Sequence, residues 1–234
     1  MINQLTKKNL KILQSKNVFK PTGTSDLLYQ SVIKSIKKPG KILDLGCGSG
    51  YVGISIKKNL KFRAEYYFSD LSKYAANLTK RNLKLNNIKG TVKSGNLFAC
   101  WSNHKFDFIV NDVSGISKQI SKYSPWYNNK IPYNSGHDGT KLTTKFILES
   151  KKYLNKNGKI YFPIISLCNY KKVLLIAKKN FKKLKLISSK SWPLPKEMYK
   201  YQTQIEKLNK KNIIFIKKKF GMIIFKTDIY SASI

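Results

Sequence analysis

The sequence predicts an α/β fold in which a parallel β-sheet is covered by helices on both faces. From residue 41 onward, short apolar runs alternate with segments of helical periodicity, which is typical of strands buried on both sides. A second observation is the glycine-rich turn in KILDLGCGSGYVGI, at 41–54, where the first such strand meets its helix. With 234 residues, 41% of them hydrophobic, the chain is long enough for one domain of this kind.

Each element has a local signal. An amphipathic helix is predicted to begin near Thr24 or Ser25, since both are good cap residues. The stretch 113–138 is expected to be irregular. Strands are predicted at 41–45, 64–70, 90–95, 106–112, 159–165 and 183–190, and further helices at 51–59, 72–86, 140–154 and 170–181.

The two ends of the chain differ from this alternating pattern. Residues 1–20 are interpreted as a short, basic, helical lead-in without a core of its own, and residues 21–234 as a single domain. Residues 192–211 are expected to form an insertion loop or helix. Residues 212–228 hold two β-rich runs around a basic turn ending in Gly221, which predicts an antiparallel hairpin at the sheet edge.

The charge of the chain is strongly positive. There are 46 Lys and Arg residues against 11 Asp and Glu, a formal net charge of +35, and such a field attracts phosphate polymers or an acidic partner. Only Arg63 and Arg81 are arginines, whereas nucleic-acid sites usually recruit arginine. An A- and T-rich genome explains the lysines but not the shortage of Glu. The expected partner is RNA, or an acidic protein that binds a basic surface.

The remaining composition points to a cytoplasmic protein, which we expect to be a monomer or a homodimer. No apolar stretch approaches the roughly 18 residues of a membrane helix, and the N-terminus lacks a secretory apolar segment. The three cysteines are too few and too irregular for a disulfide framework or a zinc cluster. We therefore expect no metal and no membrane association.

The glycine turn is the first candidate site. Gly46, Gly48 and Gly50 let a ligand approach the backbone at a helix N-terminus, and Asp44 precedes them. Tyr51 stands where a dinucleotide fingerprint needs its third glycine, and the Gly-Lys-Ser/Thr of a phosphate loop is absent. The turn therefore suits a ligand that contacts a carboxylate as well as exposed backbone groups.

Asp70 ends the next strand, about twenty residues later. A carboxylate there can accept both hydroxyls of a ribose, although Asp at the start of a helix is also a common cap. Asp44, Asp70 and Asp112 each fall at the carboxyl end of a predicted strand. That edge of an open α/β sheet is where ligands bind.

These segments resemble the successive motifs of class I S-adenosylmethionine-dependent methyltransferases. The resemblance covers about residues 18–190 and rests on the turn at 44–50, Asp70, KSGNLF and FDFIVND. It implies a Rossmann-like three-layer α/β/α sandwich with a seven-stranded, mostly parallel sheet. It also implies a cofactor site in which the turn, including Cys47, contacts the methionine part. Asp70 with Leu71 would contact the ribose, and Asn96 with Leu97 the adenine.

Within this class the chain is most similar to the small-domain methyltransferases, which include the N5-glutamine methyltransferases of release factors. VFKPTGTSDLL resembles their F-x-P-R-x-x-T segment, and GHDG at 136–139 resembles their G-G-x-D-G loop. This makes Thr22, Thr24 and His137 candidate substrate residues. Thr22 and Thr24 can equally form a turn and a cap, and a lone His in a glycine loop is often structural.

The chain departs from that group after its fourth strand. The relatives carry Asn-Pro-Pro-Tyr there, whereas this chain has Asp112, Val113, Ser114 and Gly115. Asp112 retains an acceptor that can orient an N–H or O–H group and take its proton. Asp112 and Ser114 are therefore the candidate catalytic residues, while the lost prolines and aromatic argue against glutamine or adenine as the methyl acceptor.

Trp126, with Tyr123 and Tyr127, is expected either to form an aromatic wall over a flat substrate or to pack over the sheet edge. The first hypothesis for function is a methyltransferase acting on a macromolecule of translation, either RNA or a ribosome-associated protein. A non-catalytic module that keeps the cofactor fold and a small-molecule methyltransferase are the alternatives.

Overall fold

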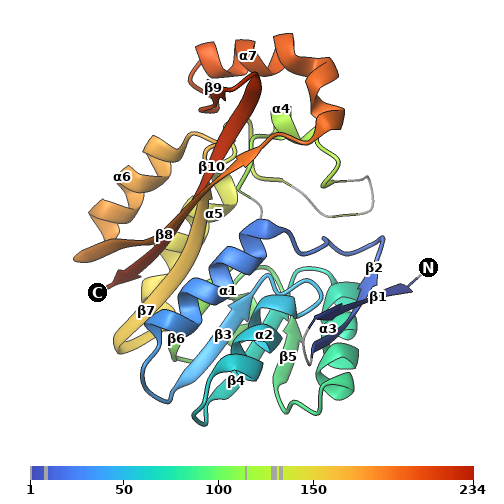
Figure 1. The fold of residues 1–234 in the computed structure, drawn as a ribbon. Helices are drawn as coiled ribbons and strands as arrows, with labels where there is room; N and C mark the ends of the chain where they lie inside the picture. Colours follow the sequence, from blue (N-terminus) through green and yellow to red (C-terminus); the bar gives the residue numbers. More distant parts are fainter. Residues whose placement is uncertain (1, 8–9, 114, 128–130, 132–133) are drawn as a thin grey trace.

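The computed structural model describes residues 2–7, 10–113, 115–127, 131 and 134–234. Its main sheet has eight strands, seven of them in the order β5-β4-β3-β6-β7-β10-β8, with β9 paired to the end of β10 (Figure 1). The strands are β3 (Lys41–Leu45), β4 (Glu65–Asp70), β5 (Thr91–Ser94), β6 (Phe106–Asn111), β7 (Leu154–Ile165), β8 (Lys183–Pro193), β9 (Lys217–Lys219) and β10 (Met222–Ser233). The predicted α/β fold with a mostly parallel sheet is confirmed.

The C-terminal hairpin is present, but its predicted position is wrong. β10 runs antiparallel to both of its neighbours, β7 and β8, so it lies inside the sheet, and β8 forms the edge. Only the short β9 precedes it in the hairpin, whereas residues 213–216 are not a strand. The second apolar run, in β10, therefore pairs mainly with β7 and β8, and not with the first apolar run at residues 213–216.

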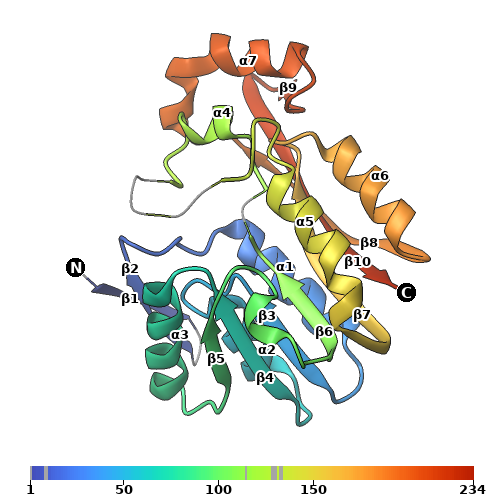
Figure 2. The same ribbon diagram turned by 180° about the vertical axis from the view of Figure 1, so that it is seen from behind.

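Helices cover both faces of the sheet, as Figures 1 and 2 show. Ile42 and Leu43 of β3 are both fully buried, and they belong to cores on opposite faces. This explains why the strand is a continuous apolar run rather than an alternating one. One face carries α1 (Gly23–Ser35), α2 (Tyr51–Asn59) and α3 (Lys73–Leu85), and the other carries α5 (Lys141–Ser150) and α6 (Tyr170–Asn180).

The N-terminal segment is a β-hairpin, so the prediction that it is helical is wrong, whereas its buried apolar residues, in the part that the structure describes, join the main core and form none of their own. β1 (Ile2–Lys7) pairs antiparallel with β2 (Leu10–Ser15), and Leu10 and Ile12 of β2 are buried. β2 lies against α3, where the Asn82 amide accepts from the Leu13 N–H at 2.8 Å and donates to the Leu13 carbonyl at 3.0 Å. A side-chain amide of the helix therefore satisfies backbone N–H and C=O groups on the edge of β2 with which no second strand among the described residues pairs.

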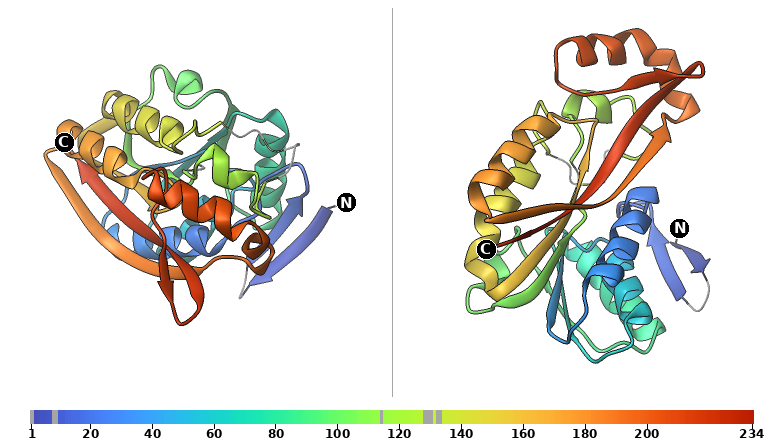
Figure 3. Two further views of the ribbon diagram at one scale, coloured as in Figure 1. Left: turned by 90° about the horizontal axis from the view of Figure 1, so that it is seen from above. Right: turned by 60° about the vertical axis from the view of Figure 1, so that its left-hand side comes forward.

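A lobe stands beyond the end of the sheet, where α4, α7 and β9 gather (Figures 1 and 3). It contains α4 (Lys118–Ser121), the 3₁₀ helix η3 (Lys196–Tyr201), α7 (Gln202–Lys210) and the β9–β10 turn. We call residues 115–127 and 192–225 the carboxyl-edge lobe. It has its own apolar core, which includes Ile120, Met198 and Ile205. The predicted irregular stretch and the predicted insertion thus meet and bury a common core.

In the described part of the chain, none of the helices is long and apolar enough to cross a membrane.

Candidate active site

The glycine turn joins β3 to α2 and is tied to the neighbouring strand. Gly46, Gly48 and Gly50 have φ angles of 75°, 56° and 78°, a left-handed conformation that glycine adopts without steric cost. The N–H groups of Gly46 and Cys47 donate to the Ser69 carbonyl at 2.7 and 2.9 Å. A side chain at Gly46 would also collide with Val113. The turn is therefore built for close approach between β3, β4 and the segment after β6.

Asp70 is held at the end of β4 by two backbone amides. Its Oδ2 accepts from the Gly48 N–H at 2.9 Å and its Oδ1 from the Ser72 N–H at 2.9 Å. Ser72, not Asp70, caps the following helix, because its side chain accepts from the Ala75 N–H. Burial raises the pKa of Asp70, and the two N–H donors oppose that rise. Each oxygen keeps a further lone pair, so a ribose diol can still bind.

Asp44 is the most buried of the three strand-end carboxylates, with 1% of its surface exposed. Its Oδ2 accepts from the Gly53 N–H at 2.8 Å, whereas its Oδ1 has no hydrogen-bond partner among the described residues. Burial raises the pKa of Asp44 to about 7, and the charges of Asp112 and Asp70 add to the effect. A buried, unpartnered carboxylate oxygen favours a cationic or hydrogen-bond-donating ligand beside it.

These groups line one cavity of about 200 Å³, which we call the cofactor cavity. It contains most of the predicted cofactor residues: Asp44, Gly46, Cys47, Gly48, Asp70, Leu71, Asn96 and Leu97. Gly50 does not line it; instead, it is the N-cap of α2, and a side chain there would meet Thr79. The Cys47 thiol is buried and lies 3.3 Å from the Thr79 hydroxyl, and burial raises its pKa, so Cys47 contributes backbone rather than a reactive sulfur.

The segment after β5 also lines the cofactor cavity. Leu97 has a φ of 47° and is buried, whereas the side chain of Asn96 is exposed. Leu71 is 60% exposed at the mouth of the site. An apolar surface with one amide at its rim is a suitable wall for a flat heterocycle such as adenine.

Asp112 follows β6 and also lines the cofactor cavity. Its Oδ2 accepts from the Ser25 hydroxyl at 2.6 Å, and the Ser25 oxygen in turn accepts from the Thr22 N–H at 3.1 Å. Thr22 is the N-cap of α1 in a capping box, two or three residues before the predicted cap at Thr24 or Ser25. Burial raises the pKa of Asp112 to about 7; the Ser25 bond lowers it, and the charge of Asp26 raises it.

A second cavity, of about 440 Å³, lies between the start of α1 and the carboxyl-edge lobe. The Trp192 indole N–H donates to the Thr227 hydroxyl at 3.2 Å, and Thr227 also contacts the Thr24 hydroxyl at 3.3 Å. This chain of bonds fixes one wall of the cavity. We call it the aromatic chamber because its lining includes the rings of Phe19, Trp126, Tyr127, Trp192 and Phe225.

The predicted substrate residues do not all reach these cavities. Thr22 and Thr24 line both of them. Trp126 lines the aromatic chamber and packs on Phe225, with ring centroids 5.7 Å apart. His137 lines neither cavity and is exposed, so the structure gives its side chain no place in the site. Ser114 falls outside the described residues.

Sequence reasoning missed three contributors. Ser25 was considered only as a cap, although the same hydroxyl bonds Asp112. Trp192 and Phe225 belong to β8 and β10 and are paired partners across those strands. No local motif marks them, since their position depends on where β10 inserts. Among the described residues, no group of His, Cys, Asp or Glu is arranged to hold a metal ion.

The family model of the methyltransferase small domain matches residues 9–112. The release factor glutamine methyltransferase of Thermodesulfovibrio yellowstonii is 31% identical over 165 residues, which cover 67% of this chain and 59% of the relative. The ribosomal RNA small subunit methyltransferase C of Haemophilus influenzae is 29% identical over 174 residues, which cover 72% of this chain and 46% of the relative. The chain thus spans about half the length of these relatives.

Solved structures share the fold. A T. thermophilus 16S rRNA methyltransferase superposes with a TM-score of 0.61 at 13% identity, covering 100% of this chain and 50% of that one. A ribosomal protein methylase from Lactobacillus delbrueckii has a TM-score of 0.55 at 16% identity, covering 93% and 82%. These two structures show the fold alone, whereas the glycine turn and the family match over residues 9–112 make the chain similar to the class I S-adenosylmethionine-dependent methyltransferases.

Proposed function

We propose that this chain transfers a methyl group from S-adenosylmethionine to a macromolecule of the translation machinery, either RNA or a ribosome-associated protein. The observation that carries the proposal is that the two cavities share part of their lining. Phe19, Thr22, Thr24, Tyr127 and Ile165 belong to both. A ligand of one cavity is therefore a neighbour of a ligand of the other, and methyl transfer needs donor and acceptor held side by side.

The residues of the cofactor cavity suit this cofactor. The unpartnered Oδ1 of Asp44 faces a buried site and is complementary to a positively charged ligand. Asp70 retains lone pairs for a ribose, and Leu97 offers an apolar surface for the base. When bound, the sulfonium cofactor supplies an activated methyl group. The protein's part is to bind it, to align the acceptor and to remove a proton.

Asp112 is the proposed proton acceptor. A pKa of about 7 means that the carboxylate is available near neutral pH and still basic enough to take a proton from an N–H or O–H group. The Ser25 hydroxyl holds one carboxylate oxygen at 2.6 Å, which fixes the orientation of the group and leaves the other oxygen for the acceptor. Ser25 is therefore a positioning residue.

Two observations support a macromolecular acceptor in translation. The relatives are named as enzymes acting on a release factor and on ribosomal RNA, and the T. thermophilus structure was solved in complex with AdoMet and guanosine. The formal charge of +35 also suits a polyanionic partner.

All three cysteines are free, which supports our expectation of a cytoplasmic protein.

The proposal is tested by incubating the protein with labelled S-adenosylmethionine and a lysate of cells that lack its gene. We expect macromolecular label that nuclease or protease removes, and each enzyme identifies its own class of acceptor. Asp112→Asn is expected to lower the transfer rate by about a hundredfold or more, while cofactor binding persists. Cofactor binding without any transfer would contradict the proposal.

That last outcome would support the alternative of a non-catalytic module. The specific observation behind this alternative is the altered segment after β6, where Val113 and Gly115 stand instead of a proline and an aromatic residue.

A further inference from the structure

The turn between β9 and β10 contains Phe220, a residue that is unsuitable for the backbone conformation of this turn. Met222 pairs with Lys219, so Phe220 and Gly221 form a two-residue hairpin loop. Their φ angles are 50° and 70°, as in a type I′ turn, where Asn-Gly is strongly preferred. Phe220 thus adopts a left-handed conformation that a bulky side chain disfavours.

Packing does not compensate for this strain. The side chain of Phe220 is 85% exposed, and Met222 beside it is 42% exposed. A side chain placed at Gly221 would meet nothing within 4 Å. Phe220 therefore adds neither core contacts nor turn stability, and Asn would serve the fold better at this position.

Positive charge surrounds the ring. Lys217, Lys218 and Lys219 are all exposed, and the Lys219 ammonium lies 5.1 Å from the centroid of the Phe220 ring. Lys218 forms an ion pair with Glu206 of α7 at 2.8 Å. Within the described part of the chain, Lys217 and Lys219 form no ion pair.

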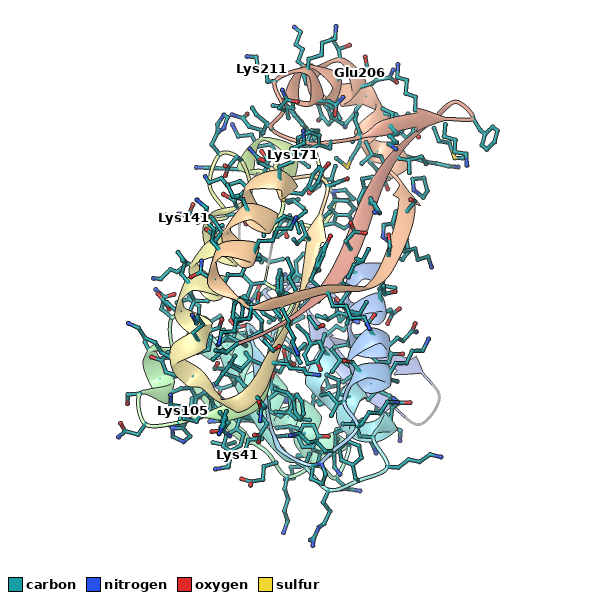
Figure 4. The ribbon with its side chains drawn as sticks, turned by 90° about the vertical axis from the view of Figure 1, so that its left-hand side faces the viewer. Lys41, Lys105, Lys141, Lys171, Glu206 and Lys211 are labelled. Atoms are coloured by element: carbon teal, nitrogen blue, oxygen red, sulfur yellow. The ribbon has the colours of Figure 1, made fainter. Side chains whose placement is uncertain are left out.

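Lysines of the adjoining helix extend this basic surface. Lys207, Lys210 and Lys211 are exposed on or just after α7. Figure 4 shows Lys211 and Glu206 at one end of the molecule, with Lys41 and Lys105 at the other. An exposed aromatic ring with flanking cations is the combination that binds single-stranded nucleic acid, because bases stack on the ring while phosphates contact the cations.

We propose that the β9–β10 turn is a binding site for single-stranded RNA, in which Phe220 stacks on a base and Lys217 and Lys219 contact the adjacent phosphates. This inference rests on the proposed function for its setting, and it selects RNA over a protein acceptor. It adds a contact outside both cavities, at the tip of the carboxyl-edge lobe.

The turn is suitably placed to guide RNA toward the aromatic chamber. β10 runs directly from Met222 to Phe225, and Phe225 lines the chamber. Phe225 follows Phe220 by five positions, so the two residues are at most about 17 Å apart at the usual rise per residue. One short strand of RNA can therefore contact the turn while a nearby nucleotide lies at the chamber.

The experiment measures binding of a short, labelled, mixed-sequence RNA by fluorescence anisotropy, without cofactor. Phe220→Asn is expected to weaken binding about tenfold, which corresponds to about 1.4 kcal/mol. Its melting temperature is expected to stay the same or rise by about 2 °C, since Asn suits the turn. Phe220→Trp keeps a stacking surface and is expected to bind like the unaltered chain.

Charge is tested separately through the salt dependence of binding. Lys217→Gln and Lys219→Gln are each expected to lower the slope of log K against log salt by about 0.7, the value for one phosphate contact on a single strand. Lys105→Gln is the matched control, because it removes one exposed lysine from the far end of the molecule. Its slope and affinity are expected to stay unchanged.

The inference is overturned if Phe220→Asn binds RNA as tightly as the unaltered chain, or if Lys105→Gln has the same effect as Lys219→Gln. Binding of anionic lipid vesicles that depends on Phe220, with RNA binding unaffected, would also overturn it. The proposed function fails by a different result, namely cofactor binding with no methyl transfer to any acceptor.

Discussion

Asp44→Asn is expected to stabilise the cofactor-free protein at neutral and alkaline pH, although Asp44 is a fully buried member of the site. Its surface is 1% exposed, and burial raises its pKa from 3.8 to about 7. Because the folded state holds the proton more tightly than the unfolded chain, the contribution of Asp44 to stability is fully present below about pH 4. It declines as the pH rises toward 7 and is constant above that.

The size of the effect follows from the shift. A rise of about three units corresponds to about 4 kcal/mol over the whole range, at about 1.4 kcal/mol per unit. Two of those units lie between pH 5 and pH 7, which leaves about 3 kcal/mol for a convenient experiment. In the unaltered protein the Gly53 N–H donates to the Asp44 carboxylate at 2.8 Å. Asn keeps an oxygen that can accept this hydrogen bond, but it does not ionise.

The assay is urea unfolding of both proteins from pH 5 to pH 8 without cofactor. We expect the stability of Asp44→Asn relative to the unaltered chain to rise by about 3 kcal/mol across this range. Asp112 has a similar pKa but is present in both proteins, so most of its contribution cancels. Parallel stability curves would refute the reasoning. The same variant is expected to bind S-adenosylmethionine more weakly, because it lacks the negative charge that faces the cofactor cavity.

Three further substitutions test the rest of the site. Asp70→Ala is expected to weaken cofactor binding by about 1.5–3 kcal/mol, the range for hydrogen bonds to a charged group, and unchanged affinity in a titration would exclude the ribose role. Ser25→Ala removes the hydrogen-bond donor that lowers the pKa of Asp112. The midpoint of the pH–kcat/KM profile is therefore expected to move to higher pH. A shift to lower pH, or no shift, would count against Asp112 as the base. Asn82→Ala removes hydrogen bonds to the backbone of Leu13 and to the Ser49 carbonyl. It is expected to destabilise the protein by about 2–3 kcal/mol in urea unfolding, because buried polar groups lose their partners. A loss of stability below the experimental error would mean that water replaces these hydrogen bonds.

The site residues that sequence reasoning found are those whose signal is local. Asp44 and the glycines lie within seven residues of one another, at a strand-to-helix turn. Asp70 and Asp112 each stand at the end of an apolar run, and parallel strands bring such ends to one edge. The cofactor cavity confirms that these groups come together, although Gly50 serves the helix cap instead of the cavity.

Other features depend on partners far away in the sequence. β2 is held in place by Asn82 of α3 and by Asn86, the C-cap of that helix, which bond its backbone across 69 and 75 residues. Taken alone, residues 1–20 are basic and contain no long apolar run, so the prediction of a helical lead-in overlooked the alternation of Leu10 and Ile12. Local periodicity in so short a segment does not say which surface will cover it.

The sequence by itself determined the alternation of strands and helices, the glycine turn and the carboxylates at the strand ends, because each is encoded within a few consecutive residues. The tertiary structure decided where β10 inserts, and with it the pairing of Trp192 with Phe225 and the walls of the aromatic chamber. The physical reason is that strand pairing is a non-local choice. It depends on which backbone edge and which apolar face remain available when the rest of the chain has folded.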